Sequence, residues 1–443
     1  MSKAFDIGFD KVDKEIALDQ LNVQGSIPEW LSGDLLRNGP GTFRVGDDHY
    51  KHWFDGLAML HRFSFSEGKV SYQNKYLDCK AYQAAKNQNR IVYPEFGTEP
   101  DDNIFGRIKS FFKPRMTDSA KVSVDKIGER ILALNETPMQ VEFDPKTLDS
   151  KGIFNYDKYP GRHITTVHPH FDRLKNKSYN LTTRFNRVSQ YRILEVEKHK
   201  QARLIASIPT HKVAYMHSFG MSENYFIVTA FPYRVNPVKF LFSSKPFIEN
   251  FKWNPDEKTR FHIADRRQPG KVISLNTEAF FAFHHVNAFE QDDRLYVDIL
   301  CYDNTEVVEA FYLKHIRADS KVLPGAEFRR YEINFDKKSI IYDVLGNESI
   351  ELTHFNKERY NMDGSYRYVY GTGVSRDKPQ SFYNQLVKID LKDNISQVWY
   401  EEGCYPGEPI FVPRPGGEKE NDGILLSVVL NEEKENAFLL VMD

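Results

Sequence analysis

Short apolar runs recur along the chain, and each of them ends in a cluster of turn-forming residues. The runs are rich in Val, Ile, Tyr and Phe, and Asp, Asn, Gly or Lys residues close them. Strands separated by turns in this way are typical of all-β proteins, whereas βαβ units alternate strands with helices. The pattern predicts an all-β sandwich or propeller, although no strict repeat is visible. Clear examples are residues 129–148, 178–185, 191–208, 223–232, 294–303 and 423–443.

Two local elements stand out within this pattern. Residues 49–79 predict a pair of strands joined by a turn at Ser-Glu-Gly-Lys, residues 66–69. Residues 305–319 predict a helix in a long connection between strands.

Two adjacent histidines, His284 and His285, lie inside the apolar run at residues 281–290. Alternation along a strand would send them to opposite faces, so only one of them could point into a given interior site. A neutral imidazole is a common ligand for transition metals, but a buried histidine bonded to backbone is the ordinary alternative. His168 and His217 also lie in strand-like runs, far from each other in sequence. This spacing suits ligands that converge from separate sheets, as in a propeller.

Composition narrows the class of protein. The chain has 443 residues, of which 40% are hydrophobic and 14% aromatic, so it can bury a large core. Its 60 Lys and Arg residues nearly balance its 62 Asp and Glu residues, which disfavours nucleic-acid binding. The first residues lack an apolar signal segment, and no run of about 18 apolar residues occurs. We therefore expect a cytoplasmic protein whose three cysteines, Cys79, Cys301 and Cys404, are reduced thiols.

Two stretches, residues 103–115 and 231–253, interleave Phe, Leu and Ile with Lys and Arg. An apolar, cationic insertion on a β scaffold can contact a membrane surface or form the lip of a tunnel for lipids. The alternative is an ordinary loop packed on the core. The sequence leaves both interpretations open, and it does not indicate an oligomeric state.

The motifs along nearly the whole chain resemble those of the carotenoid cleavage oxygenase family. They occur in the family's order at residues 33–46, 52–63, 167–172, 216–220, 283–290, 405–417 and 421–429. The resemblance implies one domain over residues 1–443, a seven-bladed β-propeller with a dome of helices and loops over its top face. It also implies one Fe(II) ion held by four histidines on the propeller axis, and a tunnel for an apolar isoprenoid substrate.

The resemblance also assigns the site residues. It implies that His168, His217 and His284 are metal ligands, and that Glu136, Glu351 and Glu408 form an outer shell around the ion. By this assignment Glu136 supports His217, and Glu351 supports His284, while His285 faces away. Four neutral imidazoles leave the charge of the iron uncompensated, so carboxylates that accept the far N–H groups would fix the rings and return negative charge. Without their motifs, these glutamates would be read as solvated surface charges.

The sequence departs from the family pattern at its end. The fourth histidine of the family lies about thirty residues beyond Asp443, and no histidine follows His354. Glu408 would support that ligand. We therefore expect a last blade without its final strand, which would leave an unpaired edge. His354 is a poor substitute, because it lies beside an outer-shell glutamate.

The implied reaction is cleavage of a conjugated double bond of a carotenoid or apocarotenoid by O2 into two carbonyl products. Neutral nitrogen ligands leave positions on Fe(II) open for O2, and the protein then positions the polyene and excludes water. We expect Phe54 and Phe283 to shape the site, because aromatic rings give rigid apolar walls. Retinyl ester isomerohydrolysis, stilbene-type alkene cleavage and a non-catalytic propeller that binds apolar ligands remain alternatives.

Overall fold

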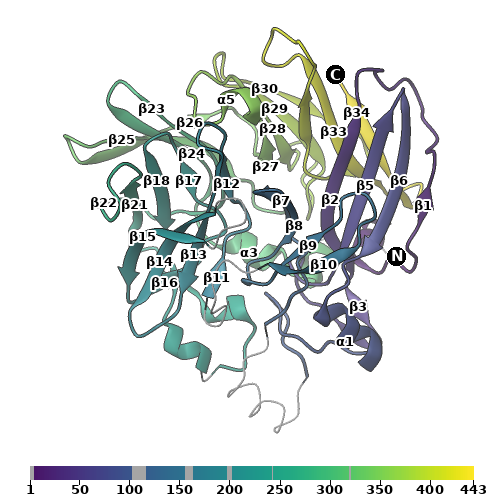
Figure 1. Ribbon diagram of the computed structural model, residues 1–443, viewed down its shortest axis with the longest axis horizontal. Coiled ribbons are helices and arrows are strands. Elements are labelled where there is room, and N and C mark those ends of the chain that lie inside the picture. The colour runs from purple at the N-terminus through teal and green to yellow at the C-terminus, as the bar shows by residue number, and fades with distance from the viewer. Residues whose placement is uncertain (1–3, 102–115, 155–162, 197–201, 242, 319–320) are drawn as a thin grey trace. The chain divides into compact units, whose positions relative to one another are not determined.

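The computed structural model describes residues 4–101, 116–154, 163–196, 202–241, 243–318 and 321–443 (Figure 1). Contacts divide the chain into two compact units. One unit contains residues 9–218 and 234–252, and the other contains residues 1–8, 219–233 and 253–443. Among the described residues, seven antiparallel sheets of four or five strands account for most of the fold, which confirms the all-β prediction.

Sheets 1 to 3 belong to the unit built on residues 9–218. Sheet 1 contains β1 Ala17–Leu18, β2 Gly33–Thr42, β5 Leu57–Ser66 and β6 Lys69–Tyr76. Sheet 2 contains β7 Ser123–Ile127, β8 Arg130–Leu134, β9 Gln140–Phe143 and β10 Ser150–Phe154. Sheet 3 contains β11 His163–Thr165, β12 His170–Asp172, β13 Lys177–Arg184, β14 Ser189–Val196 and β15 Arg203–Thr210. Figure 1 shows β2, β5 and β6 side by side as one twisted sheet.

Sheets 4 to 7 belong to the unit that ends at residue 443. Sheet 4 contains β17 Gly220–Met221, β18 Tyr225–Ala230, β21 Thr259–Asp265 and β22 Val272–Thr277. Sheet 5 contains β23 Phe281–Gln291, β24 Arg294–Tyr302, β25 Glu327–Asn334 and β26 Ser339–Leu345. Sheet 6 contains β27 Glu351–His354, β28 Tyr368–Gly373, β29 Gln385–Asp390 and β30 Ile395–Trp399. Sheet 7 contains β31 Cys404–Pro406, β32 Ile410–Pro413, β33 Gly423–Asn431 and β34 Asn436–Met442.

Short strands complete the fold. Two small sheets contain β3 Arg44–Val45 with β4 Asp48–His49, and β16 Val213–Ala214 with β19 Tyr233–Val235 and β20 Lys252–Trp253. The predicted turn between β5 and β6 is present, with positive φ at Glu67 and Gly68. Two successive residues with positive φ match the right-handed twist of a hairpin, and the glycine adopts this conformation without strain.

In sheet 7, two short strands share one edge of the same neighbouring strand. The strand β33 pairs with β34 along one edge and with both β31 and β32 along the other. The β34 side chains are exposed or half-buried, as expected for an edge strand. Within the described residues, the four strands of sheet 7 thus occupy three positions, and the expected lack of a final strand stays a prediction.

Among the residues that the structure describes, helices are few and short. They are η1 Ala4–Phe9, α1 Lys80–Gln88, η2 Pro237–Leu241, η3 Phe247–Asn250, α3 Glu306–Ala310, α4 Leu313–Ile316 and α5 Lys357–Tyr360. The single helix predicted over residues 305–319 is wrong, because the backbone leaves the helical region at Tyr312, where ψ is 132°. In the described part of the chain, no helix has both the length and the apolar character needed to cross a bilayer.

The stretch at residues 231–253 packs inward along much of its length. The Phe240 ring stacks on Phe247 at a centroid distance of 5.5 Å, and Phe247 contacts Phe251 at 5.2 Å. Ile248 and Phe251 are buried, whereas Val238 is 55% exposed. These contacts favour the interpretation as a loop packed on the core, and membrane contact here stays a prediction. The other stretch, residues 103–115, lies outside the described residues.

Candidate metal centre

His168 and His217 both lie at interruptions between short strands. The strands β11 and β12 pair with different parts of one edge of β13, and His168 lies in the gap between them. His217 lies between β16 and β17. Because neither residue is part of a ladder, its side chain is not bound by the alternation of a strand. The two imidazole rings meet edge to face, with centroids 5.0 Å apart.

A carboxylate holds the His217 ring. The Nδ1 atom of His217 lies 2.7 Å from Oε1 of Glu136, in the loop between β8 and β9, and both side chains are mostly buried. The Tyr215 hydroxyl donates to the same oxygen at 2.5 Å. The backbone supports this loop too, since the Glu136 carbonyl accepts a hydrogen bond from the Thr165 N–H at 2.7 Å. The pairing of Glu136 with His217 that the resemblance implies is therefore present as a hydrogen bond.

His284 lies at an irregular point of β23. The register between β23 and β24 shifts between Ala282 and His285 and again between His285 and Asn287. A β-bulge changes the direction of a side chain at such a point, and bulges are frequent beside functional sites. The neighbouring His285 faces a different partner, because its Nε2 lies 2.8 Å from the Thr229 hydroxyl of β18.

A second carboxylate holds the His284 ring in the same way. The Nδ1 atom of His284 lies 2.5 Å from Oε2 of Glu351, which is the first residue of β27 and only 2% exposed. The Tyr302 hydroxyl donates to the other oxygen of Glu351 at 3.1 Å. Burial raises the pKa of the Tyr302 hydroxyl well above its usual value, so this group stays a donor at neutral pH. Each unit therefore contains a triad of histidine, glutamate and tyrosine.

The chemistry of these triads fits a transition metal. A neutral imidazole that donates Nδ1–H to a carboxylate keeps its lone pair on Nε2, which is the form that binds a metal. The carboxylate also raises the basicity of the ring and fixes its orientation. His217 and His284 meet this requirement, and the edge-to-face contact of His168 with His217 keeps its ring close to the first of them. The donor set suits Fe(II), since imidazole nitrogen is a common ligand of iron.

The two aromatic residues predicted to shape the site lie beside these histidines. The Phe54 ring stacks on the His217 ring, with centroids 5.9 Å apart and planes inclined by 22°. Phe283 is 3% exposed and lies 6.2 Å from the His284 ring. Phe283 also packs against Phe281 at 4.9 Å and Phe311 at 6.1 Å. Rigid apolar surface therefore adjoins both triads.

Two further residues from the sequence prediction lie in sheets 6 and 7. Glu408 is exposed and lies between β31 and β32 of sheet 7. His354 accepts a hydrogen bond from the Phe411 N–H on Nδ1 at 3.3 Å, and burial lowers its pKa to about 3. The supporting role of Glu408 stays a prediction.

Sequence reasoning missed the two tyrosines of the triads. Tyr215 precedes His217 by two residues, so a strict alternation argument could have placed both side chains on one face. Tyr302 precedes Glu351 by 49 residues and comes from a different sheet, so no local signal connects them. Each tyrosine donates to an oxygen of a carboxylate that also holds a histidine.

Replacing Glu351 with glutamine should weaken metal binding by about 10- to 100-fold, because a neutral amide is a poorer acceptor for the His284 N–H. Titration of the metal-free protein with Fe(II) against a competing chelator measures this. The matched control is Glu290→Gln, since Glu290 is a half-buried glutamate of β23 that bonds the Ser222 hydroxyl and the Asn224 amide. An unchanged affinity in Glu351→Gln, or an equal loss in the control, would contradict a supporting role for Glu351.

Comparison with known proteins defines the class to which this fold and these triads belong. The chain belongs to the carotenoid cleavage oxygenase family, because the family model described as retinal pigment epithelial membrane protein matches residues 9–443. Among its relatives, the β,β-carotene 15,15′-dioxygenase of Homo sapiens is 32% identical over 95% of this chain and 87% of its own length. The mitochondrial carotenoid-cleaving dioxygenase of Macaca fascicularis is 32% identical over 95% of this chain and 86% of its own.

Solved structures agree with this assignment. A variant of Synechocystis apocarotenoid oxygenase matches with a TM-score of 0.88 and 25% identity, covering 99% of this chain and 92% of that one. The cobalt-substituted Synechocystis enzyme matches with a TM-score of 0.87, 24% identity and the same coverage. The fold class is the seven-bladed β-propeller, as the sequence predicted, and the seven sheets are its blades.

Proposed function

We propose that this protein is a non-haem Fe(II) dioxygenase that cleaves a conjugated double bond of a carotenoid or apocarotenoid into two carbonyl products. His168, His217 and His284 bind the iron through ring nitrogens, and Glu136 and Glu351 orient two of them. The observation that carries the proposal is the pair of largely buried histidine–carboxylate hydrogen bonds, at 2.7 and 2.5 Å.

Two further observations support the shared ion. One candidate ligand atom of His168 and one of His217 lie within 4.8 Å of each other. Ligand bonds from imidazole nitrogen to a metal are about 2 Å long, so one ion can join atoms at this spacing. In addition, one solved structure of the same fold is that of a cobalt-substituted enzyme. Cobalt and iron both accept imidazole ligands.

The names of the relatives support the substrate class. Homologues along nearly the whole chain are named β,β-carotene 15,15′-dioxygenase and carotenoid-cleaving dioxygenase. Both names describe cleavage of a long apolar polyene. The aromatic surfaces of Phe54 and Phe283 beside the histidines suit such a substrate.

The residues of the chain have a limited set of tasks in this reaction. When bound, Fe(II) supplies a centre at which O2 can react with the polyene. Phe54 and Phe283 form apolar walls that hold the polyene flat and keep water away from it. Glu136 and Glu351 keep Nδ1 of His217 and His284 protonated, so that Nε2 stays available as a ligand. No acidic or nucleophilic side chain is needed for the bond cleavage itself.

Turnover in ¹⁸O2 tests the reaction class. The purified, iron-loaded protein is given β-carotene and a panel of apocarotenals, and the products are analysed by mass spectrometry. We expect two carbonyl products that each carry one ¹⁸O atom, and no turnover without O2. Parallel reactions in H2¹⁸O measure exchange of carbonyl oxygen with water. Equal product in the absence of O2 would rule out cleavage by dioxygen, and no product with full iron loading would indicate a binding propeller.

A further inference from the structure

A lysine and a glutamate form an ion pair deep in the unit built on residues 9–218. The Nζ atom of Lys121 lies 2.5 Å from Oε2 of Glu95, and the two side chains are 1% and 3% exposed. Burial raises the pKa of Glu95 to about 7, although Lys121 acts in the opposite direction. A buried ion pair contributes little net stability, because desolvation offsets the Coulomb attraction. The contacts around the pair therefore indicate its role better than its contribution to stability does.

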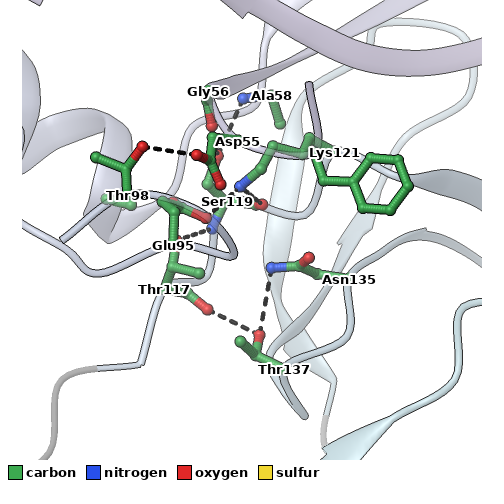
Figure 2. A network of polar contacts seen from close by, with 12 residues as sticks. Asp55, Gly56, Ala58, Glu95, Thr98, Thr117, Ser119, Lys121, Asn135 and Thr137 are labelled. Atoms are coloured by element: carbon green, nitrogen blue, oxygen red, sulfur yellow. Dashed lines mark hydrogen bonds and ion pairs between the residues drawn. The ribbon is translucent and has the colours of Figure 1, made fainter. Parts of the chain in front are cut away.

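The pair joins two segments that are distant in sequence. The other oxygen of Glu95 accepts a hydrogen bond from the Thr117 hydroxyl at 2.8 Å. Lys121 donates a second hydrogen bond to the Ser119 carbonyl at 3.2 Å. As a result, residues 95–98 and residues 117–121 are held together at one buried point (Figure 2).

The segment at residues 95–98 in turn holds Asp55. The Asp55 carboxylate accepts hydrogen bonds from the Gly97 N–H at 2.9 Å and from the Thr98 hydroxyl at 2.6 Å. Gly97 lies very close to the same segment, because a Cβ atom added there would lie 2.5 Å from Cβ of His52. Asp55 also accepts a hydrogen bond from the His52 N–H at 3.1 Å.

The segment at residues 117–121 binds the backbone that follows Asp55. The Ser119 hydroxyl donates to the Gly56 carbonyl at 3.1 Å and accepts a hydrogen bond from the Ala58 N–H at 3.0 Å. Figure 2 shows Asp55, Gly56 and Ala58 next to Ser119 and Lys121. Both segments joined by the ion pair therefore bind residues that closely follow Phe54, namely Asp55 for one segment and Gly56 and Ala58 for the other.

Phe54 connects this network to the histidines. Its N–H donates to the His52 ring at 3.1 Å, and its own ring packs against Phe96 at 5.1 Å and stacks on His217. Phe96 follows Glu95 directly. The position of the Phe54 ring therefore depends on Phe96, which is the neighbour of Glu95 in the ion pair.

The same network reaches the carboxylate that supports His217. The Thr137 hydroxyl donates to the Thr117 carbonyl at 2.8 Å, and Thr137 directly follows Glu136. Figure 2 shows this link between Thr117 and Thr137. The Lys121–Glu95 pair therefore lies between the residues that hold Phe54 in place and the hydrogen bond from Thr137, the neighbour of Glu136.

We propose that Lys121 and Glu95 are positioning residues that hold the Phe54 ring against His217 and so fix one wall of the substrate site. This inference rests on the proposed function for its effect on catalysis, but not for its geometry. The pair acts through the segments at residues 52–58 and 95–98, and it touches neither substrate nor metal. A displacement of about 1 Å at a reacting centre can cost about a hundredfold in rate, so a rigid support is useful here.

The test removes both charges together, because a single change would leave one buried charge uncompensated. In Lys121→Met/Glu95→Gln, methionine keeps the length of the lysine chain, and glutamine keeps an oxygen for the Thr117 hydroxyl. Val70→Ala, at a buried position of β6, is the control for general destabilisation. Gly97→Ala is a second variant, because it disturbs the same segment through His52 and leaves the pair intact.

The first readout is the crystal structure of each iron-loaded variant. We expect the Phe54 ring to leave its stacked position at 5.9 Å from His217 in the double variant and in Gly97→Ala. It should stay in place in Val70→Ala. An unmoved Phe54 ring in the double variant would overturn the proposal, and this readout decides it even if no carotenoid is cleaved by the wild-type protein.

The second readout is a double-mutant cycle with Phe54→Leu on kcat/KM. If the pair acts through Phe54, the double variant should lose about tenfold in the wild-type background and less than about twofold in the F54L background. Equal losses in both backgrounds would show a merely structural role and contradict the proposal. Failure of the wild-type protein to form product would instead contradict the proposed function.

Discussion

His284→Ala should lose its iron and its activity, whereas His285→Ala should keep both. The two residues are neighbours in β23, but they have different partners. His284 is held by Glu351, and His285 contacts the Thr229 hydroxyl. Removing a ligand should cost more than the about 10- to 100-fold expected for loss of its supporting carboxylate. Loss of the His285 contact should cost about 1 kcal/mol of stability.

Iron content after purification, together with initial rates, measures this prediction. His285→Ala is a strict control, because it removes the same side chain from the adjacent position of the same strand. Thermal unfolding of both variants shows whether the fold is retained. Full iron content in His284→Ala would remove this residue from the ligand set, and iron loss in His285→Ala would reverse the assignment.

Lys121→Met alone should destabilise the protein by about 3–5 kcal/mol, because it leaves the Glu95 carboxylate buried without its partner. Lys121→Met/Glu95→Gln should cost much less, since no charge is then left uncompensated. Urea denaturation at constant pH measures both free energies of unfolding. Equal losses in the single and double variants would mean that the ion pair does not determine the effect.

The loss of unfolding free energy caused by Lys121→Met should grow as the pH rises. Burial raises the pKa of Glu95 from 4.5 to about 7 in the wild-type protein. A group whose pKa is raised by folding adds stability below its unfolded pKa, and that stability is lost as pH rises through the folded pKa. Without Lys121 the folded pKa rises further, so the loss continues above pH 7. The difference in unfolding free energy between wild type and variant should therefore widen from pH 6 to pH 8, and a constant difference would contradict this.

The sequence predicted those parts of the fold that depend on local patterns. The strands and the hairpin turn at residues 66–69 follow from alternation and turn chemistry, and they are confirmed. The helix over residues 305–319 was wrong, because its apolar spacing did not show the break near Tyr312. The family motifs carried the prediction of seven blades, since no repeat in the sequence indicates the number of sheets.

The candidate site could be predicted only where motifs marked it. Glu351 and His284 are 67 residues apart, and nothing in their spacing connects them without the family motifs. The Lys121–Glu95 pair was missed because a lone lysine between short apolar residues reads as a solvated side chain. Its burial follows from tertiary packing of segments 26 residues apart. The single domain, the dome, membrane contact and cytoplasmic location stay predictions.

An anomalous-scattering map at the iron absorption edge, from crystals of the iron-loaded protein, tests the central claim most directly. The account predicts one strong peak within bonding distance of the Nε2 atoms of His168, His217 and His284. A fully loaded protein whose iron peak lies away from any of these three nitrogens would contradict it.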